Sequence, residues 1–300
     1  MSKIAVIGIA GESVFLSVDS FGITGETTVA DSFYSELGGK GFNQAIAAAN
    51  YGAEVSFLAA AYCEDVKAFT EIAEQCGVKA FFVAKPQRSP YAVITTDRTG
   101  DNRVCVYRGA SLTERDIDCF ADEIKAADIL LINNEIPASV NRRAVDTAKE
   151  HGVTVILNPA PSCSYDKNFL DKIDLFTPNE HERDGLDAYG NVIVTLGKKG
   201  CFIRQSGLTV PAERVENVID STGAGDVFNG VLAACLADGE DIRTACQKAN
   251  VAAAIKVGRR YILHSIPTKT EIDSYTPLRC EKDNRSVNKT DKQIIRAFDE

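Results

Sequence analysis

Residues 220–230 read Asp220-Ser-Thr-Gly-Ala-Gly-Asp226-Val-Phe-Asn-Gly230, a glycine turn that runs into an apolar segment. The apolar side chains after the turn repeat with helical spacing, and Gly239 is placed to end the helix. The free N–H groups and the positive dipole end at such a helix start attract anions. Asp226 beside them could take a proton from a hydroxyl that attacks a phosphate. Taken alone, these residues fit equally well a tight turn in which Asp226 caps the helix.

The composition predicts a soluble chain with a large core. The 300 residues are 45% hydrophobic and carry a net charge of -9, without a Lys/Arg cluster, so no nucleic-acid partner is expected. Nine cysteines without a C-x-x-C pair argue against a zinc site or a disulfide framework, and predict buried free thiols. No leader precedes the strand-like run 3–8, and no apolar run approaches the ~20 residues of a membrane helix. We therefore expect a cytoplasmic protein that does not bind membranes.

Alternating patterns predict an α/β fold with a central, mostly parallel sheet and helices on both faces. Apolar strands are expected at 4–7, 55–60, 78–83, 129–132 and 153–157, and helices at 65–76, 114–126, 137–150 and 241–257. Short strands at 14–18 and 27–34 and a hairpin at 91–96 and 103–107 interrupt this series. They predict a small β lid, from about 12–35 and 90–108, that closes over a site. A single domain is expected over 1–275, followed by a charged tail over 276–300.

Polar residues follow the expected strands, where open α/β sheets bind their ligands. These strand ends carry Asn133-Asn-Glu135, Asn158-Pro-Ala-Pro161, Thr177-Pro-Asn-Glu180 and Thr195-Leu-Gly197, and together they predict one shared cleft.

A second glycine turn opens a small-residue helix at Gly38-Gly-Lys-Gly-Phe-Asn-Gln-Ala45. It lacks the spacing of a P-loop, but Lys40 and Asn43 could bind hydroxyl or phosphate oxygens. Asn179 and Glu182 are spaced to share one face of a helical turn, where hard oxygen ligands suit Mg²⁺. The same pair would also fit an ordinary helix start, with Asn179 as its cap.

The two glycine turns resemble the two signatures of the ribokinase-like (PfkB) carbohydrate kinases. The segments 158–161, 177–182 and 194–200 fall in the order of that family, and the resemblance covers roughly residues 3 to 275. It is strongest to the ribokinase branch. It implies a parallel sheet with a β lid, and ATP-dependent phosphorylation of a sugar hydroxymethyl group, ribose-like in the first instance.

Matching motif positions imply a role for each site residue. The resemblance makes Asp226 the catalytic base and the amides of Gly223, Ala224 and Gly225 the anion hole. The sugar positions are Gly39, Lys40, Asn43 and Glu135, together with Gly11 and Ser13 after the first strand. The nucleotide positions are Asn179, Thr195, Gly197, Gly200 and Asn250. Glu182 would hold Mg²⁺ through water, and Asp220 and Thr222 lie where related kinases bind an activating potassium ion.

Departures from the family pattern leave the acceptor open. Gly11 and Ser13 stand where the family has a sugar-binding asparagine and aspartate, so a nucleoside or another sugar derivative is an alternative acceptor. The loop 259–265 is bulkier than its family counterpart, which counts against potassium, and the segment after Glu182 is too short for the usual helix. A non-catalytic sugar or nucleotide sensor is a third hypothesis. A homodimer through the lid is also plausible, because a partner can cover exposed lid strands.

Overall fold

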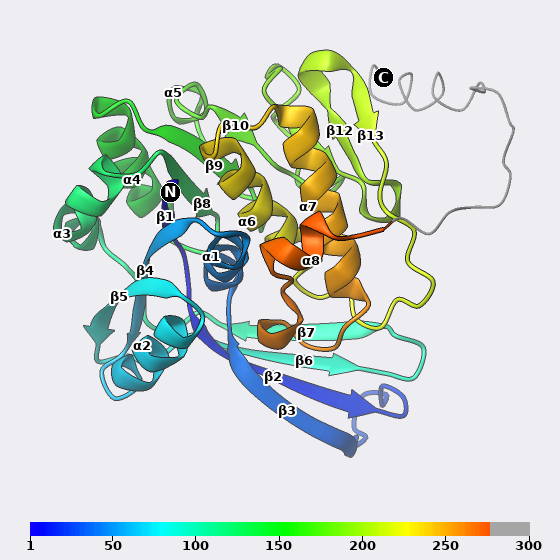
Figure 1. Cartoon of the computed structure of the whole chain (residues 1–300). Coiled ribbons are helices and arrows are strands. Elements are labelled where there is room, and N and C mark those ends of the chain that lie inside the picture. The colour runs from blue at the N-terminus through cyan, green and yellow to red at the C-terminus, as the bar shows by residue number, and fades with distance from the viewer. Residues whose placement is uncertain (277–300) are drawn as a thin grey trace, which may run out of the picture.

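A six-stranded parallel sheet forms the centre of the computed structural model, which describes residues 1–276 (Figure 1). The strand order is β10-β9-β8-β1-β4-β5, and every neighbouring pair is parallel. The strands are β1 (Lys3–Ile7), β4 (Glu54–Tyr62), β5 (Val78–Lys85), β8 (Ile129–Asn133), β9 (Thr154–Asn158) and β10 (Leu175–Phe176). The predicted α/β fold is confirmed. The expected tail lies almost wholly outside the described residues.

Helices cover both faces of this sheet, because its strands are apolar on both sides. In β1, Ile4 and Val6 pack into one core and Ala5 and Ile7 into the other. The first core contains α1 (Lys40–Tyr51), α2 (Val66–Gln75), α6 (Ala224–Ala237) and α7 (Ile242–Val257). The second contains α3 (Glu114–Lys125) and α4 (Ala138–Glu150), with the short α5 (Lys167–Leu170). The short α8 (Lys269–Asp273) packs on α7.

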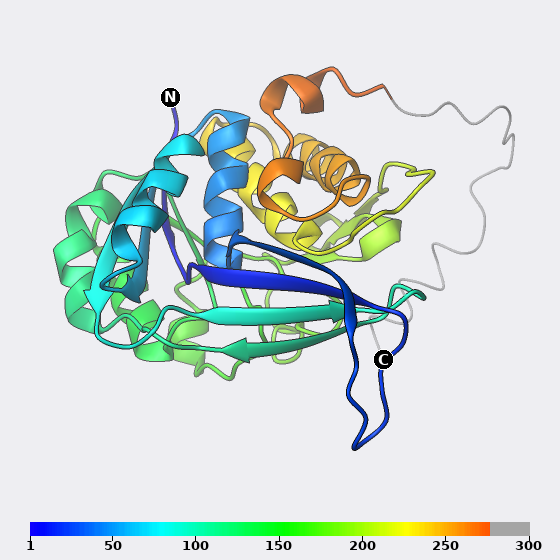
Figure 2. The ribbon, with the colours of Figure 1, turned by 90° about the horizontal axis from the view of Figure 1, so that it is seen from below.

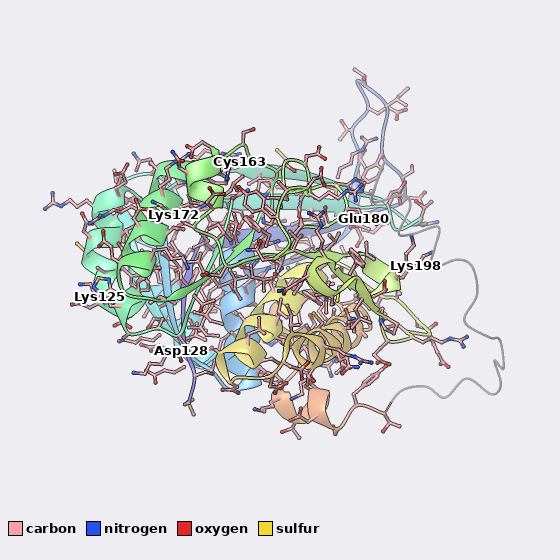
Figure 3. The ribbon with its side chains drawn as sticks, turned by 90° about the horizontal axis from the view of Figure 1, so that it is seen from above. Lys125, Asp128, Cys163, Lys172, Glu180 and Lys198 are labelled. Carbon is pink, nitrogen blue, oxygen red and sulfur yellow. The ribbon has the colours of Figure 1, made fainter. Side chains whose placement is uncertain are left out.

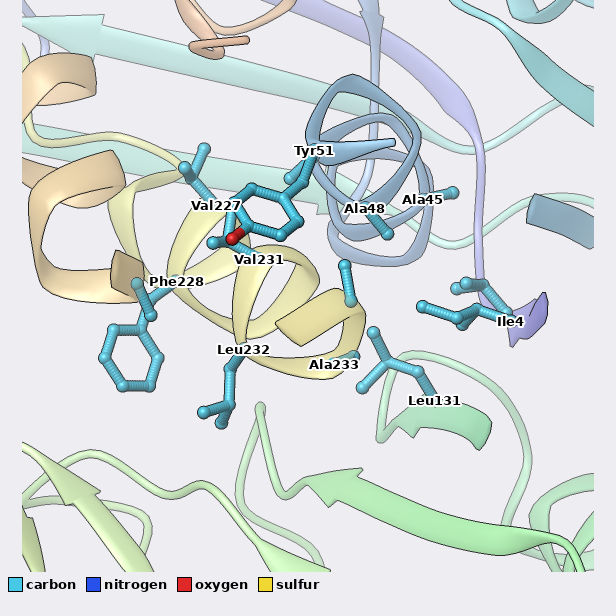
Figure 4. Close-up of a cluster of buried hydrophobic side chains, with 14 of the residues drawn as sticks. Ile4, Ala45, Ala48, Tyr51, Leu131, Val227, Phe228, Val231, Leu232 and Ala233 are labelled. Atoms are coloured by element: carbon cyan, nitrogen blue, oxygen red, sulfur yellow. The ribbon is translucent and has the colours of Figure 1, made fainter. Parts of the chain in front are cut away.

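The two glycine signatures meet because α1 and α6 pack closely against each other (Figure 4). Gly230 lies at the crossing: a Cβ atom there would be 2.3 Å from the carbonyl oxygen of Gln44 and 2.6 Å from the Ala47 Cβ atom. Only small residues permit this approach, and α1 provides Ala45, Ala47 and Ala48. The helix pair therefore places Asn43 and Asp226 next to each other.

A separate four-stranded sheet forms the lid and extends beyond the body of the molecule (Figure 2). Its order is β3-β2-β6-β7, from β2 (Gly11–Val18), β3 (Ala30–Gly38), β6 (Tyr91–Thr96) and β7 (Asn102–Tyr107). The strand expected at 27–34 lies at 30–38 instead. Pairing with β2 continues to Gly38, which faces Gly11, and so buries residues whose sequence shows no clear alternation.

The loop after α7 packs against the end of the lid that leads into the central sheet, here called the root of the lid, at Tyr34 and Glu36 of β3. Tyr261 stacks on Tyr34 of β3, with ring centroids 3.7 Å apart, and adopts a left-handed backbone conformation with φ 63°. The Glu36 carboxylate accepts hydrogen bonds from the amides of Ile262 at 2.7 Å and Leu263 at 3.0 Å. The chain thus fastens residues near its C-terminal end to its first β-hairpin.

A third, antiparallel sheet lies beside α7 and contains β11 (Ile193–Thr195), β12 (Cys201–Ile203) and β13 (Leu208–Val210). The segment 183–190 contains turns and no helix, as its length predicts. The described cysteines are all free. Cys201, Cys235 and Cys246 are buried, Cys76 is half-buried, and Cys63, Cys105, Cys119 and Cys163 are exposed, so the expectation of buried thiols holds only in part. Within residues 1–276, no helix has both the length and the apolar character needed to cross a membrane.

Candidate active site

A cavity of about 230 Å³ lies between the carboxyl ends of the central strands and the root of the lid. All the predicted sugar-binding residues line it: Gly11, Ser13, Gly39, Lys40, Asn43 and Glu135. Thr222, Gly223 and Asp226 line it from the start of α6. The structure therefore brings residues of both signatures to one cavity.

A larger cavity, of about 350 Å³, lies at the opposite end of the sheet, where strands β8, β9 and β10 begin. Asp128, just before β8, lines this second cavity. Figure 3 shows Asp128 on the far side of the molecule from Cys163, which comes after the carboxyl end of β9. Neither signature contributes a residue to this second cavity. The candidate site is therefore the cavity at the carboxyl ends of the strands.

Asp226 lies in the first turn of α6 and is 6% exposed. The Asn43 side-chain amide donates to its Oδ2 atom at 2.9 Å, and Gln44 Nε2 lies 3.5 Å from its Oδ1 atom. Gln44 Nε2 also donates to Asn158 Oδ1 at 3.1 Å, and Asn158 Nδ2 donates to the Thr177 carbonyl oxygen at 2.8 Å. This line of amides runs from the strand ends to the carboxylate and orients it.

Gln44 is a site residue that the sequence analysis missed. It is fully buried in α1, although glutamine is usually exposed. Its position directly after Asn43 in the glycine signature was the available signal. Its role became visible only once α6 and β9 were placed beside it.

Charges in the cavity balance one another. Burial raises the pKa of the Asp226 carboxyl, and the Lys40 ammonium is the main opposing influence. In turn, Asp226 is the main cause that raises the pKa of Lys40. Burial also raises the pKa of Glu135 to about 7, and its Oε2 atom accepts the backbone amide of Lys40 at 2.8 Å. Lys40 therefore stays charged between two carboxyl groups that bind protons more readily than usual.

The start of α6 offers fewer free amides than the resemblance implies. The Ala224 amide donates to the Ser221 carbonyl oxygen at 3.2 Å and so completes the turn. Within residues 1–276, the amides of Gly223 and Gly225 have no hydrogen-bond acceptor. Gly223 has φ 75°, a conformation suited to glycine, and a Cβ atom on Gly225 would meet nothing within 4 Å. An anion can thus approach the backbone closely here.

Asn179 and Glu182 pair with each other, but in a turn rather than in the helical turn that their spacing predicts. The backbone N–H of Asn179 donates to Glu182 Oε2 at 3.1 Å, and the backbone N–H of Glu182 donates to Asn179 Oδ1 at 3.0 Å. Thr195 lies beside them, because its amide donates to the Pro178 carbonyl oxygen at 2.9 Å.

The described residues contain no group of three or more His, Cys, Asp or Glu that could hold a metal ion by itself. The Glu182 carboxylate nevertheless suits Mg²⁺ as a hard oxygen ligand. This ion usually keeps several of its waters and binds one or two carboxylates together with the phosphates of a substrate.

Gly197 and Gly200 bound the turn between β11 and β12. A Cβ atom on Gly200 would lie 2.0 Å from the Val210 carbonyl oxygen, so only glycine fits there. The resemblance places Asn250 on the nucleotide side. Asn250 is 6% exposed, and its amide donates at 3.1 Å to the carbonyl oxygens of both Val210 and Pro211. In this structure Asn250 supports the loop after β13, and contact with a nucleotide stays a prediction.

A fully buried lysine sits at the expected potassium position. Asp220 Oδ1 accepts the Thr222 amide at 2.9 Å, and its Oδ2 atom accepts the Tyr261 amide at 3.0 Å. The Lys256 ammonium donates to the Asp220 carbonyl oxygen at 2.7 Å, and the lysine side chain is 0% exposed. Asp220 and Thr222 thus lie together beside a cation of the chain itself.

The model of the pfkB family carbohydrate kinase matches residues 1–269. The chain belongs to this family. It is 32% identical to the deoxyribokinase of Salmonella typhi, over 92% of this chain and 99% of that one. It is 33% identical to a bifunctional ribokinase/ribose-5-phosphate isomerase A of Fructilactobacillus sanfranciscensis, over 91% of this chain but only 56% of that protein. The solved ribokinase of Thermotoga maritima superposes with a TM-score of 0.80 at 30% identity, covering 91% of this chain and 99% of that one.

Membership of this family makes the protein a phosphotransferase with an alcohol group as acceptor. The fold class and the relation to ribokinase that the signatures predict are confirmed.

Proposed function

We propose that the protein is an ATP-dependent sugar kinase that phosphorylates a hydroxymethyl group, and that Asp226 is its base. The supporting observation is the Asp226 carboxylate, held by Asn43 and Gln44 in a cavity that it shares with Lys40 and the start of α6. Asp226 takes the proton of the acceptor hydroxyl while that oxygen bonds to the γ-phosphorus and the bond to the β-phosphate oxygen breaks, releasing ADP.

The remaining groups of the site stabilise charge. The free amides of Gly223 and Gly225 point to an anion hole for the transferred phosphoryl group, and Lys40 adds a positive charge beside it. When bound, Mg²⁺ supplies charge neutralisation on the phosphates, and Glu182 would hold it through water. Asn179, Thr195, Gly197 and Gly200 are proposed for the nucleotide side. Exposed free thiols suit the reducing cytoplasm.

The acceptor is proposed to be ribose-like, with a nucleoside or another sugar derivative as the alternative. Two observations support keeping that alternative. A side chain at position 11 is excluded, because a Cβ atom on Gly11 would lie 2.0 Å from the Pro90 carbonyl oxygen. Apolar side chains form much of the lid side of the cavity, among them Phe15, Ile94 and Val104. An acceptor with fewer hydroxyl groups would suit this wall.

The proposal is tested by ADP formation with ribose, deoxyribose, fructose derivatives and nucleosides as acceptors. Asp226→Asn should lower kcat by about 10²–10⁴-fold on the best acceptor while circular dichroism and melting stay unchanged. Asp238→Asn, at the other end of α6, is the matched control and should keep full turnover. Near-full turnover of the Asp226 variant would refute the assigned base. Ligand binding without ADP from any acceptor would favour a sensor.

We also propose that a second copy covers the lid. Val104 and Val106 of β7 are 56% and 53% exposed, and both line the cavity. A partner lid placed over them would bury apolar surface and close the site at once.

A further inference from the structure

Lys256, in the last turn of α7, has a setting that is rare for lysine. Its side chain is 0% exposed, and lysine is almost never fully buried unless it is paired. Its Nζ atom donates to the Asp220 carbonyl oxygen at 2.7 Å and lies 3.6 Å from the Asp220 Oδ2 atom. Burial lowers the pKa of Lys256, and Asp220 is the main opposing influence. A charge buried at this cost requires a compensating role.

The surroundings of Lys256 connect three parts of the active site. Asp220 begins the signature that carries Asp226, and its carboxylate accepts the amides of Thr222 and Tyr261. The loop that contains Tyr261 is held to the lid by Glu36, which lies near enough to Lys256 to affect its pKa. The ammonium therefore lies where three segments meet: the anion-site loop at residues 220–225, the loop after α7, and the end of β3 that carries Glu36.

A potassium ion does not fit beside Asp220 in this chain. Potassium sites are built from rings of oxygen ligands that replace the hydration shell of the ion. Here the carbonyl oxygen of Asp220 already accepts the ammonium, and each of its carboxylate oxygens accepts a backbone amide. A second positive charge at this place would also be repelled by Lys256.

We propose that the Lys256 ammonium is a built-in monovalent cation, which holds the anion-site loop at residues 220–225 in its binding conformation without added potassium. Lys256 is a positioning residue, since it touches the loop and not the reacting atoms. The proposal rests on the proposed kinase function and assigns to this chain a cation-independent form of it.

The first test compares the wild-type protein in buffers with tetramethylammonium or with potassium as the added cation. We expect the same melting temperature, the same affinity for a non-hydrolysable ATP analogue and the same kcat in both. A potassium-dependent rise in any of these quantities would overturn the proposal. If no acceptor supports ADP formation, the kinase function fails, but melting and nucleotide affinity still decide the role of Lys256.

The second test removes the ammonium. Lys256→Ala leaves space for an ion, and it should show weak nucleotide binding in tetramethylammonium that potassium restores by about 5–150-fold, the usual range of coupling between two ligands. Lys256→Met keeps the bulk of the side chain without its charge, so it should bind weakly and respond much less to potassium.

Lys248→Met, on the same helix and 30% exposed at its side chain, is the control and should show no cation response. A Lys256→Ala protein that binds nucleotide like the wild type in both buffers would contradict the proposal. If neither Lys256 variant folds, the wild-type comparison decides alone.

Discussion

At the scale of single residues, the site depends on side chains whose partners are remote in sequence. Asn43 and Lys40 could be predicted because they stand in a recognisable signature. Gln44 stands in the same signature, but its partners could not be predicted, and neither could Lys256 nor the supporting role of Asn250. Each of these residues binds an atom from a distant segment, and spacing along the chain carries no information on such a contact.

Gln44→Leu gives a prediction at this scale. The leucine keeps the volume but removes the amide that lies between Asp226 and Asn158. A hydrogen bond to a charged group contributes about 1.5–3 kcal/mol, so kcat should fall roughly 10- to 100-fold in a steady-state assay of ADP release. Gln247→Leu, at an exposed position on α7, should leave kcat unchanged. Equal kcat for both variants would show that Asn43 alone orients the carboxylate.

At the scale of elements, periodicity predicted most helices and central strands to within a few residues. It failed where pairing rather than pattern decides the structure. β13 was missed because it is short and follows the glycine turn at Gly207. β3 was placed too early, because its last residues become strand only through pairing with β2. The turn at Asn179 took the hydrogen bonds of a helix start without a following helix.

Gly230→Ala tests the contact between α1 and α6. Alanine favours a helix over glycine by about 1 kcal/mol, so in an isolated helix this change would be stabilising. In this protein the new methyl group would lie 2.3 Å from a carbonyl oxygen of α1, and we expect a net loss of about 1–3 kcal/mol in the free energy of unfolding. Chemical denaturation measures the change. Gly190→Ala, where a Cβ atom meets nothing within 4 Å, is the control. Unchanged stability of Gly230→Ala would mean that the helices separate without cost.

At the scale of the whole molecule, the lid carries an apolar surface that residues 1–276 leave uncovered. Replacing Val104 and Val106 together by lysine should turn a dimer into a monomer, because charges on a buried interface are costly. Light scattering after size exclusion measures the mass. Val218→Lys, 65% exposed and outside the lid, should stay dimeric. A monomeric wild-type protein would contradict the proposal of a second copy over the lid.

The bond between Asn43 and Asp226 joins residues 183 positions apart. During synthesis the ribosome therefore releases the first signature long before the second exists. The Tyr261 loop, which fastens the lid, follows later still. A nascent chain that ends before residue 226 cannot form this hydrogen bond, and contacts of such long range are formed slowly. We therefore expect a nascent chain to show no kinase activity until α6 has been made, because α6 brings Asp226 to the cavity that Asn43 lines.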